Sequence, residues 1–411
     1  MSLAKIQVES NNKVKSKHNR IWIALILGFL SSIPPFATDF YLPALPQMTT
    51  SLDTNAALVQ LSLTAFLLGM AIGQLVIGPY SDVLGRRVPL LVSLLIFTVT
   101  TILCAYSPSI WVLVILRVLQ GLSGAGGVVL SRAIVRDLYT GYEITRFMAI
   151  LALVNGVITV LAPVVGGQLL RFTDWRGIFL ILGVISVIVF INVIVGVKET
   201  LPVTERTESG LKNTLINFGN LFKDKVFIGY TFTQGLIFGG FFGYLSASPF
   251  VLQDIYGLSA QEYSYSFGIN ATGVLIATFI ASKFVMNYGE KRILGFVLNL
   301  SLISSLLLLF SILLKWNIVM ILIAFFLIFS CMGVISMLSN SLAMQSQEKN
   351  AGSASALLGL VPFVIGAITA PLVGIGGGDT AVPMAVVIVA CNIGAFACLR
   401  KLVGLKNRIE N

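Results

Sequence analysis

The sequence predicts an all-α membrane protein with twelve transmembrane helices, arranged as two six-helix halves with both termini in the cytoplasm. Composition is the first reason, because 56% of the 411 residues are hydrophobic and only 11% are charged, against roughly a quarter in soluble domains. Segment length is the second reason, because apolar runs of about 20 residues, enough to cross a bilayer, recur along the chain. These runs are too long, and alternate too little, for the strands of a membrane barrel.

Charged residues and clusters of Pro, Gly and Asn separate the apolar runs and set the expected helix boundaries. The first half should contain helices over residues 21–44, 56–79, 88–106, 109–132, 146–170 and 177–197. The second half should contain helices over residues 227–250, 264–286, 293–314, 316–343, 352–375 and 380–400. The domains are then a basic tail (1–20), a first half (21–197), a linker (198–226), a second half (227–400) and a second tail (401–411), with the tails and the linker cytoplasmic.

The distribution of Lys and Arg predicts the orientation. If the N-terminus is cytoplasmic, nearly all of the 27 Lys and Arg residues fall in cytoplasmic segments. The opposite side then keeps only Arg171, Arg176 and Lys315, and Arg117 lies within a helix. Such an excess on one side is the positive-inside signal of membrane proteins. The net charge of +10 is therefore explained by contact with anionic lipids and requires no nucleic-acid partner.

Several function classes are excluded by what the sequence lacks. The four cysteines lie inside apolar runs without metal-ligand spacing, and the single histidine is His18 in the basic tail. No metal site or cofactor is expected, and the absence of a Gly-Lys dipeptide excludes an ATP-binding loop. The loops are too short for an enzymatic domain, so we expect no enzyme. Two six-helix halves around a midplane site are typical of a secondary transporter.

Two charged residues lie well inside predicted helices, Asp39 in the first and Arg117 in the fourth. Charges within the membrane are costly and usually mark ion or substrate pathways. One interpretation is a structural Arg–Asp pair. The other is a proton-coupling site that also contacts substrate, with protons as the coupling ion. Both interpretations stay open from the residues alone.

The loop between the second and third helices reads GQLVIGPYSDVLGRR over residues 73–87. It resembles the loop signature of the major facilitator superfamily. The resemblance implies the major facilitator fold and a conformational latch formed by five residues: Gly78, Asp82, Gly85, Arg86 and Arg87. We expect the partner of the aspartate at the start of the eleventh helix, near residues 350–353. The loop NYGEKR at residues 287–292 keeps a glycine and a basic pair in the second half, as expected from an ancient duplication.

The fifth helix contains APVVGG over residues 162–167. Proline bends a helix, and glycines allow close helix packing. This segment resembles the antiporter motif of the same superfamily in part, with Pro163, Gly166 and Gly167 as its matching residues. The resemblance implies a bend that prevents leak, and a plain kinked helix is the alternative.

Four stretches carry a more specific resemblance: TDFYLPALP (38–46), DWRGIF (174–179), SASPF (246–250) and NAGSASALLG (350–359). Together they are similar to the bicyclomycin/chloramphenicol resistance subfamily of twelve-helix drug:proton antiporters. The resemblance covers nearly the whole chain. It implies export of drugs or small metabolites across the bacterial cytoplasmic membrane in exchange for protons.

Polar and aromatic side chains on the predicted helices are the candidates for the substrate site. Besides Asp39 and Arg117, the selected candidates are Gln120, Asn155, Tyr230, Gln234, Phe238 and Phe242. Amides and hydroxyls can bind substrate or simply hydrogen-bond neighbouring helices, and aromatic rings offer stacking surfaces. We expect a monomer that works on a small-molecule drug or metabolite. A proton-coupled carrier of one specific metabolite or sugar, exporter or importer, is the alternative, because the same fold serves both.

Overall fold

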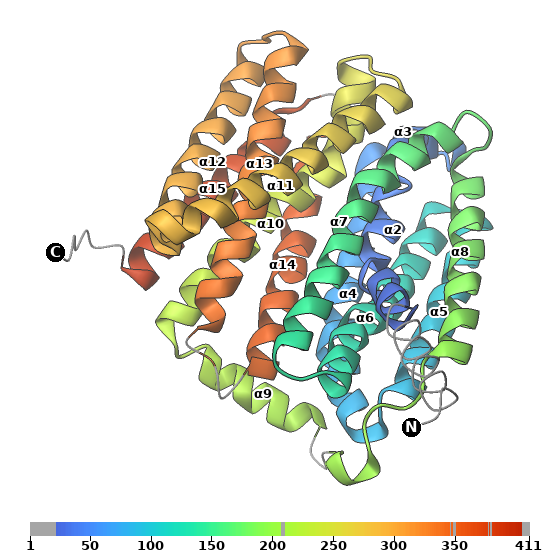
Figure 1. Cartoon of the computed structure of the whole chain (residues 1–411). Helices are drawn as coiled ribbons and strands as arrows, with labels where there is room; N and C mark the ends of the chain where they lie inside the picture. Colours follow the sequence, from blue (N-terminus) through green and yellow to red (C-terminus); the bar gives the residue numbers. More distant parts are fainter. Residues whose placement is uncertain are drawn as a thin grey trace, which may run out of the picture.

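The computed structural model describes residues 22–206, 210–345, 347, 351–376, 378 and 380–404. Within them, eleven helices are long and apolar enough to cross a membrane, and a bent helix pair at the start is a twelfth candidate span. Figure 1 shows two helical bundles side by side, the first blue to green and the second yellow to red. The predicted all-α membrane fold is confirmed. The basic tail at 1–20, with His18, lies outside the described residues.

The first span is broken rather than continuous. A helix over Trp22–Ser31 meets the segment Ile33–Ser51 at an angle of 46°, and that segment comprises α2 (Ile33–Asp39), the short 3₁₀ turn η1 (Leu42–Ala44) and α3 (Leu45–Ser51). Proline cannot donate a backbone hydrogen bond, and Pro34 and Pro35 lie in the first turn of α2, just after the break. As a result, Asp39 lies at the end of a short helix, where the backbone changes course.

The other helices follow the expected order with longer cytoplasmic ends. The first half continues with α4 (Ala56–Leu84), α5 (Arg87–Ala105), α6 (Ile110–Leu138), α7 (Tyr142–Leu169) and α8 (Trp175–Gly196). The linker contains the short turn η2 (Val203–Glu205) and a helix, α9 (Gly210–Leu221). The second half contains α10 (Lys225–Phe250), continued by η3 (Val251–Ile255), then α11 (Ala260–Tyr288), α12 (Glu290–Leu313), α13 (Ile318–Met344), α14 (Ala351–Gly374) and α15 (Val382–Cys398), continued by η5 (Leu399–Val403).

Helix α6 is longer than the sequence pattern suggested. The expected boundary near residue 132 is wrong, because α6 continues to Leu138 and Arg132 and Arg136 therefore belong to the helix. No proline or glycine interrupts the chain between Val129 and Leu138, and the helix ends only before Gly141, which has a positive φ of 54°. The two arginines lie inside the fold rather than in a loop.

Helices α4 and α6 pack at backbone distance in the first half. A Cβ atom at Gly121 would lie 2.1 Å from the carbonyl oxygen of Phe66, and one at Gly69 would lie 2.2 Å from the carbonyl oxygen of Val118. Only glycine permits this approach, which is typical of small-residue helix contacts in membranes. The crossing brings Phe66 next to the turn of α6 that carries Arg117.

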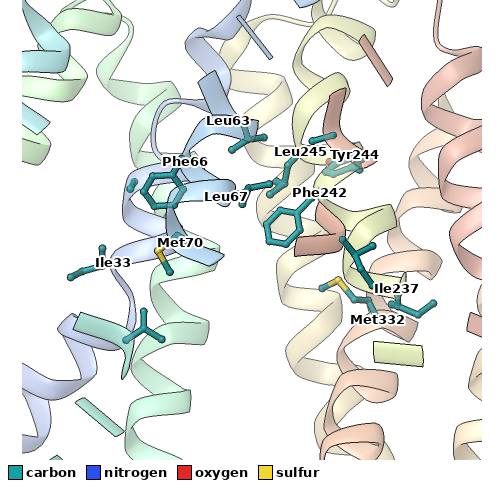
Figure 2. Close-up of a cluster of buried hydrophobic side chains, with 14 of the residues drawn as sticks. Ile33, Leu63, Phe66, Leu67, Met70, Ile237, Phe242, Tyr244, Leu245 and Met332 are labelled. Atoms are coloured by element: carbon teal, nitrogen blue, oxygen red, sulfur yellow. The ribbon is translucent and has the colours of Figure 1, made fainter. Parts of the chain in front are cut away.

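The two halves meet along α4 and α14 and along α7 and α11. At the extracytoplasmic end, the Gln168 amide donates to the Tyr265 hydroxyl at 2.8 Å, and the Gln261 amide donates to the Gly167 carbonyl at 2.8 Å. Near the membrane centre the contact is apolar, and in Figure 2 Leu67 of α4 lies between Phe66 and Phe242 of α10. At the cytoplasmic end, a cavity of about 550 Å³ separates parts of α4, α6 and α14.

Candidate transport site

Arg117 is the centre of a polar network in the first half, and its side chain is completely buried. Its Nη1 donates to the Ala37 carbonyl at 2.9 Å and to Oε1 of Gln120 at 2.5 Å. Weaker bonds of 3.4 Å reach the Ser62 carbonyl and the Tyr41 hydroxyl. Hydrogen bonds to acceptors in several directions compensate the loss of water around a buried guanidinium.

Aromatic rings enclose the same guanidinium. Its central carbon lies 4.5 Å from the ring centroid of Phe66, 4.7 Å from that of Tyr41 and 6.0 Å from that of Phe179. A cation within about 6 Å of an aromatic face is attracted by the ring quadrupole, more strongly where water is absent. Arg117 therefore keeps its charge in place without a carboxylate.

The network continues through Gln120 to a third helix. The Gln120 amide nitrogen donates to the Thr101 hydroxyl of α5 at 2.7 Å. The Thr101 hydroxyl in turn donates to the Phe97 carbonyl at 2.6 Å. Contacts of Arg117 and Gln120 thus connect α2, α4, α5, α6 and α8. A substitution of Arg117 would therefore remove contacts to several helices of the first half.

Asp39 is buried, with 3% of its surface exposed. The Thr38 hydroxyl donates to its Oδ1 at 2.7 Å. No salt bridge joins Asp39 to Arg117, although the structure describes both residues. Four residues after Asp39, the Pro43 carbonyl accepts a hydrogen bond from the Gln253 amide of the second half at 3.2 Å. Asp39 therefore lies near the boundary between the halves, while Arg117 is satisfied by neutral acceptors.

The proline–glycine motif of the predicted fifth helix lies in α7 and packs against the backbone next to Asp39. Pro163 lies within α7, which continues unbroken to Leu169. A Cβ atom at Gly166 would lie 2.0 Å from the carbonyl oxygen of Phe40, and one at Gly167 would lie 2.0 Å from Oγ of Ser264 in α11. The two glycines therefore let α7 touch both the residue after Asp39 and the opposite half.

The remaining substrate candidates lie apart from Arg117. The Asn155 amide donates to the Ser31 carbonyl at 3.0 Å, which is a helix–helix contact within the first half. Tyr230 and Gln234 are buried on α10, and Oε1 of Gln234 has no hydrogen-bond partner among the described residues. Phe238 and Phe242, with ring centroids 6.2 Å apart, belong to an aromatic cluster of the second half. The structure thus divides the eight candidates between the two halves.

The cytoplasmic loop of the first half is an ion-pair network centred on Arg86. Gly85 has a φ of 94°, a conformation that glycine adopts without strain. The Arg86 guanidinium, in a residue 8% exposed, donates to Asp137 at 2.9 Å, to the Ser81 hydroxyl at 2.7 Å and to Asp82. Burial works to lower the pKa of Arg86, but the bonds and charges of Asp137 and Asp82 outweigh it and raise the pKa.

Glu199, at the start of the linker just after α8, binds the other side of this loop. Its carboxylate accepts hydrogen bonds from the backbone N–H groups of Arg86 at 2.8 Å and Arg87 at 3.1 Å, at the start of α5. Burial works to raise the pKa of Glu199, but hydrogen bonds from four backbone N–H groups outweigh it and lower the pKa. A carboxylate at a helix N-terminus is also favoured by the helix dipole.

Among the described residues, Asp82 bonds to Arg86, and its expected contact with the start of the eleventh helix stays a prediction. Asn350 lies outside the described residues, and the Ser353 hydroxyl accepts a bond from the Asn217 amide of α9 at 3.4 Å. Asp82 and Ser353 nevertheless line the same cytoplasmic cavity. The residues Gly78, Asp82, Gly85, Arg86 and Arg87 form one loop network, whose role as a latch stays a prediction.

The corresponding loop of the second half, at residues 287–292, has a residue of opposite charge after its glycine. Gly289 has a φ of 76°, like Gly85, but the next residue is Glu290 instead of an arginine. The Glu290 carboxylate accepts bonds from the Ser341 hydroxyl and the Gln345 amide of the α13 end, both at 2.7 Å. In each half, this loop is therefore bonded to the cytoplasmic end of the fourth helix. The first half uses an ion pair with α6, and the second half uses hydrogen bonds from neutral side chains of α13.

Sequence reasoning missed several partners in these networks. Tyr41, Thr101, Asp137 and Glu199 had no assigned role, although Tyr41 lies in a stretch that carried the subfamily resemblance. Asp137 and Glu199 could have been found as acidic residues on the side of the membrane where the basic residues gather. Thr101 gave no signal, because a threonine in an apolar helix is not distinctive.

Comparison with known proteins identifies relatives over most of the chain. The model of the Major Facilitator Superfamily matches residues 22–371. The uncharacterized MFS-type transporter YdgK of Bacillus subtilis is 41% identical over 92% of this chain and 94% of its own length. The bicyclomycin resistance protein homolog of Haemophilus influenzae is 33% identical over 89% of this chain and 92% of its own. A solved D-xylose-proton symporter has a TM-score of 0.73 at 16% identity, covering 94% of this chain and 97% of that one, a likeness of fold alone.

Proposed function

Because the chain belongs to the Major Facilitator Superfamily, we propose that it is a proton-coupled efflux antiporter that exports drugs or small metabolites by alternating access. The protein is a secondary transporter and not an enzyme, and it is a multi-pass protein of the bacterial cytoplasmic membrane. The proposal adds the coupling ion, the direction of transport and the class of substrate.

The sequence relationship to a bicyclomycin resistance protein homolog supports the assignment to the drug-efflux subfamily. The stretches at residues 38–46 and 174–179 that suggested this subfamily also meet in the structure. Tyr41 and Phe179 pack with ring centroids 5.4 Å apart, and both flank Arg117. The resemblance therefore concerns residues that surround one buried charge, which favours a shared transport mechanism.

The burial of Asp39 is the observation that carries the proposal. No other Asp or Glu in the described part of the chain is buried to this degree. An ionised carboxylate in an apolar site is costly, so such a group tends to hold a proton unless a cation or water compensates. Asp39 lies beside the contact between α7 and α11, which must open and close if the halves alternate. A change in packing there can change the affinity of the carboxyl group for a proton.

The transport cycle that we propose follows from this position. In the outward-facing state, Asp39 takes a proton from the exterior and becomes neutral. The neutral site permits the return to the inward-facing state, where cytoplasmic substrate competes with the proton. One charge that crosses 100 mV contributes about 2.3 kcal/mol, enough for a roughly 50-fold substrate gradient. Arg117 holds α2 and its neighbours in register and keeps a positive charge in the first half.

The test compares wild type with Asp39→Asn. Everted membrane vesicles would be energised with an acidic lumen, and substrate-induced proton release would be recorded. The panel would contain neutral drugs of the chloramphenicol type, fluoroquinolones, lipophilic cations and amino acids. We expect proton-coupled flux with wild type and none with Asp39→Asn at equal membrane expression. Asp53→Asn is the matched control, because Asp53 is exposed and has a φ of 47° that asparagine tolerates.

Full coupled transport by Asp39→Asn would refute the role of Asp39. Proton-linked uptake in place of efflux would favour the alternative, a proton-coupled carrier of one metabolite or sugar. The fold likeness to a D-xylose-proton symporter leaves that alternative open at the level of fold, because carriers of both kinds share one architecture.

A further inference from the structure

The cytoplasmic cavity has a volume of about 550 Å³. Its walls come from α4 and α6 of the first half and from the start of α14 in the second. The linker helix α9 contributes Asn217 and Phe218 to its lining, and Figure 1 shows α9 crossing the cytoplasmic end of both bundles. A cavity of this size can contain a small solute.

Two arginines of α6 project into this cavity. Arg132 and Arg136 are four residues apart and therefore lie on the same face of the helix. Both side chains are exposed to the cavity that they line. Neither has an ion pair or a hydrogen bond with any residue that the structure describes. Two like charges one helical turn apart repel each other, so their arrangement favours a negatively charged occupant.

The acidic residues that line the cavity, Asp82 and Asp137, form their ion pairs with Arg86 rather than with Arg132 or Arg136. Asp137 and Asp82 both accept hydrogen bonds from the Arg86 guanidinium. Asp137 also accepts the Thr200 hydroxyl at 3.0 Å. Arg86 thus engages both carboxylates. Their negative charges still act on Arg136, but neither carboxylate forms an ion pair with Arg132 or Arg136.

An uncharged donor lies beside Arg132. Nε2 of Gln74 has no hydrogen-bond partner among the described residues, although Gln74 is only 7% exposed and lines the cavity. A Cβ atom at Gly359 of α14 would lie 2.8 Å from Oε1 of Gln74 and 3.7 Å from Nη1 of Arg132. Glycine at this position therefore lets the second half approach both side chains. A buried donor without an acceptor costs free energy unless a ligand supplies one.

We propose that this cavity is an anion-binding vestibule, in which Arg132, Arg136 and Gln74 bind the carboxylate or phosphate group of a small cytoplasmic solute. Guanidinium groups bind both kinds of anion through paired hydrogen bonds. The inference rests on the proposed function for its biological meaning, since a cytoplasmic vestibule is where an exporter first meets its substrate. It narrows the substrate class to solutes with an anionic group.

The test measures binding rather than transport, so that its result does not depend on proton coupling. The full-length protein, purified in detergent, would be titrated by calorimetry with glycerol 3-phosphate, and with glycerol as the uncharged match. We expect wild type to bind only the phosphate compound, and Arg132→Gln/Arg136→Gln to bind it at least about tenfold more weakly. Arg292→Gln is the matched control, because this exposed arginine lies outside the cavity. The single variant Arg132→Gln replaces the double variant if the latter does not fold.

Equal binding by the double variant and wild type, or equal binding of glycerol, would overturn the proposal. Lipid as the source of the anion is tested in nanodiscs of phosphatidylglycerol and of phosphatidylcholine. Loss of glycerol 3-phosphate binding only in phosphatidylglycerol would assign the arginines to a lipid headgroup and overturn the solute assignment. Asp53→Asn should bind like wild type, because Asp53 is exposed and does not line the cavity. The titration involves no proton gradient, so failure of the vestibule and failure of proton coupling give different results.

Discussion

Gly166→Ala tests whether close packing of α7 positions Asp39. The new methyl group would lie 2.0 Å from the carbonyl oxygen of Phe40, and ordinary contact begins at 3.4 Å. Both partners belong to backbone segments, so α7 and the segment after α2 must separate. Overpacking of this kind costs about 1–3 kcal/mol, which corresponds to a shift of roughly 5- to 150-fold in a conformational equilibrium. Because Phe40 follows Asp39 directly, the displacement reaches the carboxyl group.

Thermal unfolding in detergent and proton-coupled efflux in everted vesicles would both be measured. We expect Gly166→Ala to unfold at a lower temperature and to lose most of its coupled transport. Gly156→Ala is the control on the same helix, because its methyl group would meet the end of the Leu275 side chain at 2.9 Å, and a flexible side chain can move. Wild-type stability and transport in Gly166→Ala, or equal losses in both variants, would refute the reasoning.

Two further predictions concern Arg117 and Glu199. Arg117→Lys keeps the charge, but an ammonium group cannot reproduce the bonds to Ala37 and Gln120, so efflux activity should fall at least about tenfold; activity near wild type would mean that charge alone suffices. Glu199→Gln should be less stable than wild type at neutral pH. Burial works to raise the pKa of Glu199, but the backbone N–H bonds outweigh it and lower the pKa in the folded protein. The ionised carboxylate therefore stabilises the fold above the ordinary pKa of 4.5, and this stabilisation is lost as the pH falls through the folded pKa. The difference in unfolding temperature between the two proteins should therefore shrink in acid, and a constant difference would contradict this account.

The sequence was sufficient for the fold because the bilayer simplifies the problem. Apolar length predicted the spans, and the asymmetry of Lys and Arg predicted their orientation. Burial of Asp39 and Arg117 was also predictable, since charges in apolar runs stand out. Their failure to form an ion pair was not, because it depends on the tertiary contacts of Arg117 with the Ala37 carbonyl and the Phe66 ring. Sequence spacing carries no information about which acceptor a long side chain reaches.

In the cytoplasmic networks, too, some features could be predicted from the sequence and others depended on tertiary contacts. The glycine turn and the basic pair at residues 85–87 were recognised, but Asp137 became visible as a partner only when α6 was seen to continue past the expected boundary. Arg136 likewise lies beyond the predicted end of this helix at residue 132, so its place on the same helical face as Arg132 was not predicted. Helix ends are poorly specified by hydropathy where no proline or glycine stops the helix, and here the functional interpretation depended on about two turns.

The opposite charges after the two glycine turns make the halves unequal in their response to ionic strength. Arg86 binds two carboxylates, an attraction that dissolved salt weakens wherever the charges are reached by water, and the Asp82 side chain is 47% exposed. Glu290 binds a hydroxyl and an amide, neutral donors whose bonds depend less on counterions. Concentrated electrolyte should therefore loosen the cytoplasmic rim of one half before the other. The loop at residues 85–87 should therefore be the salt-sensitive one, and the loop at residues 289–290 should respond little to ionic strength.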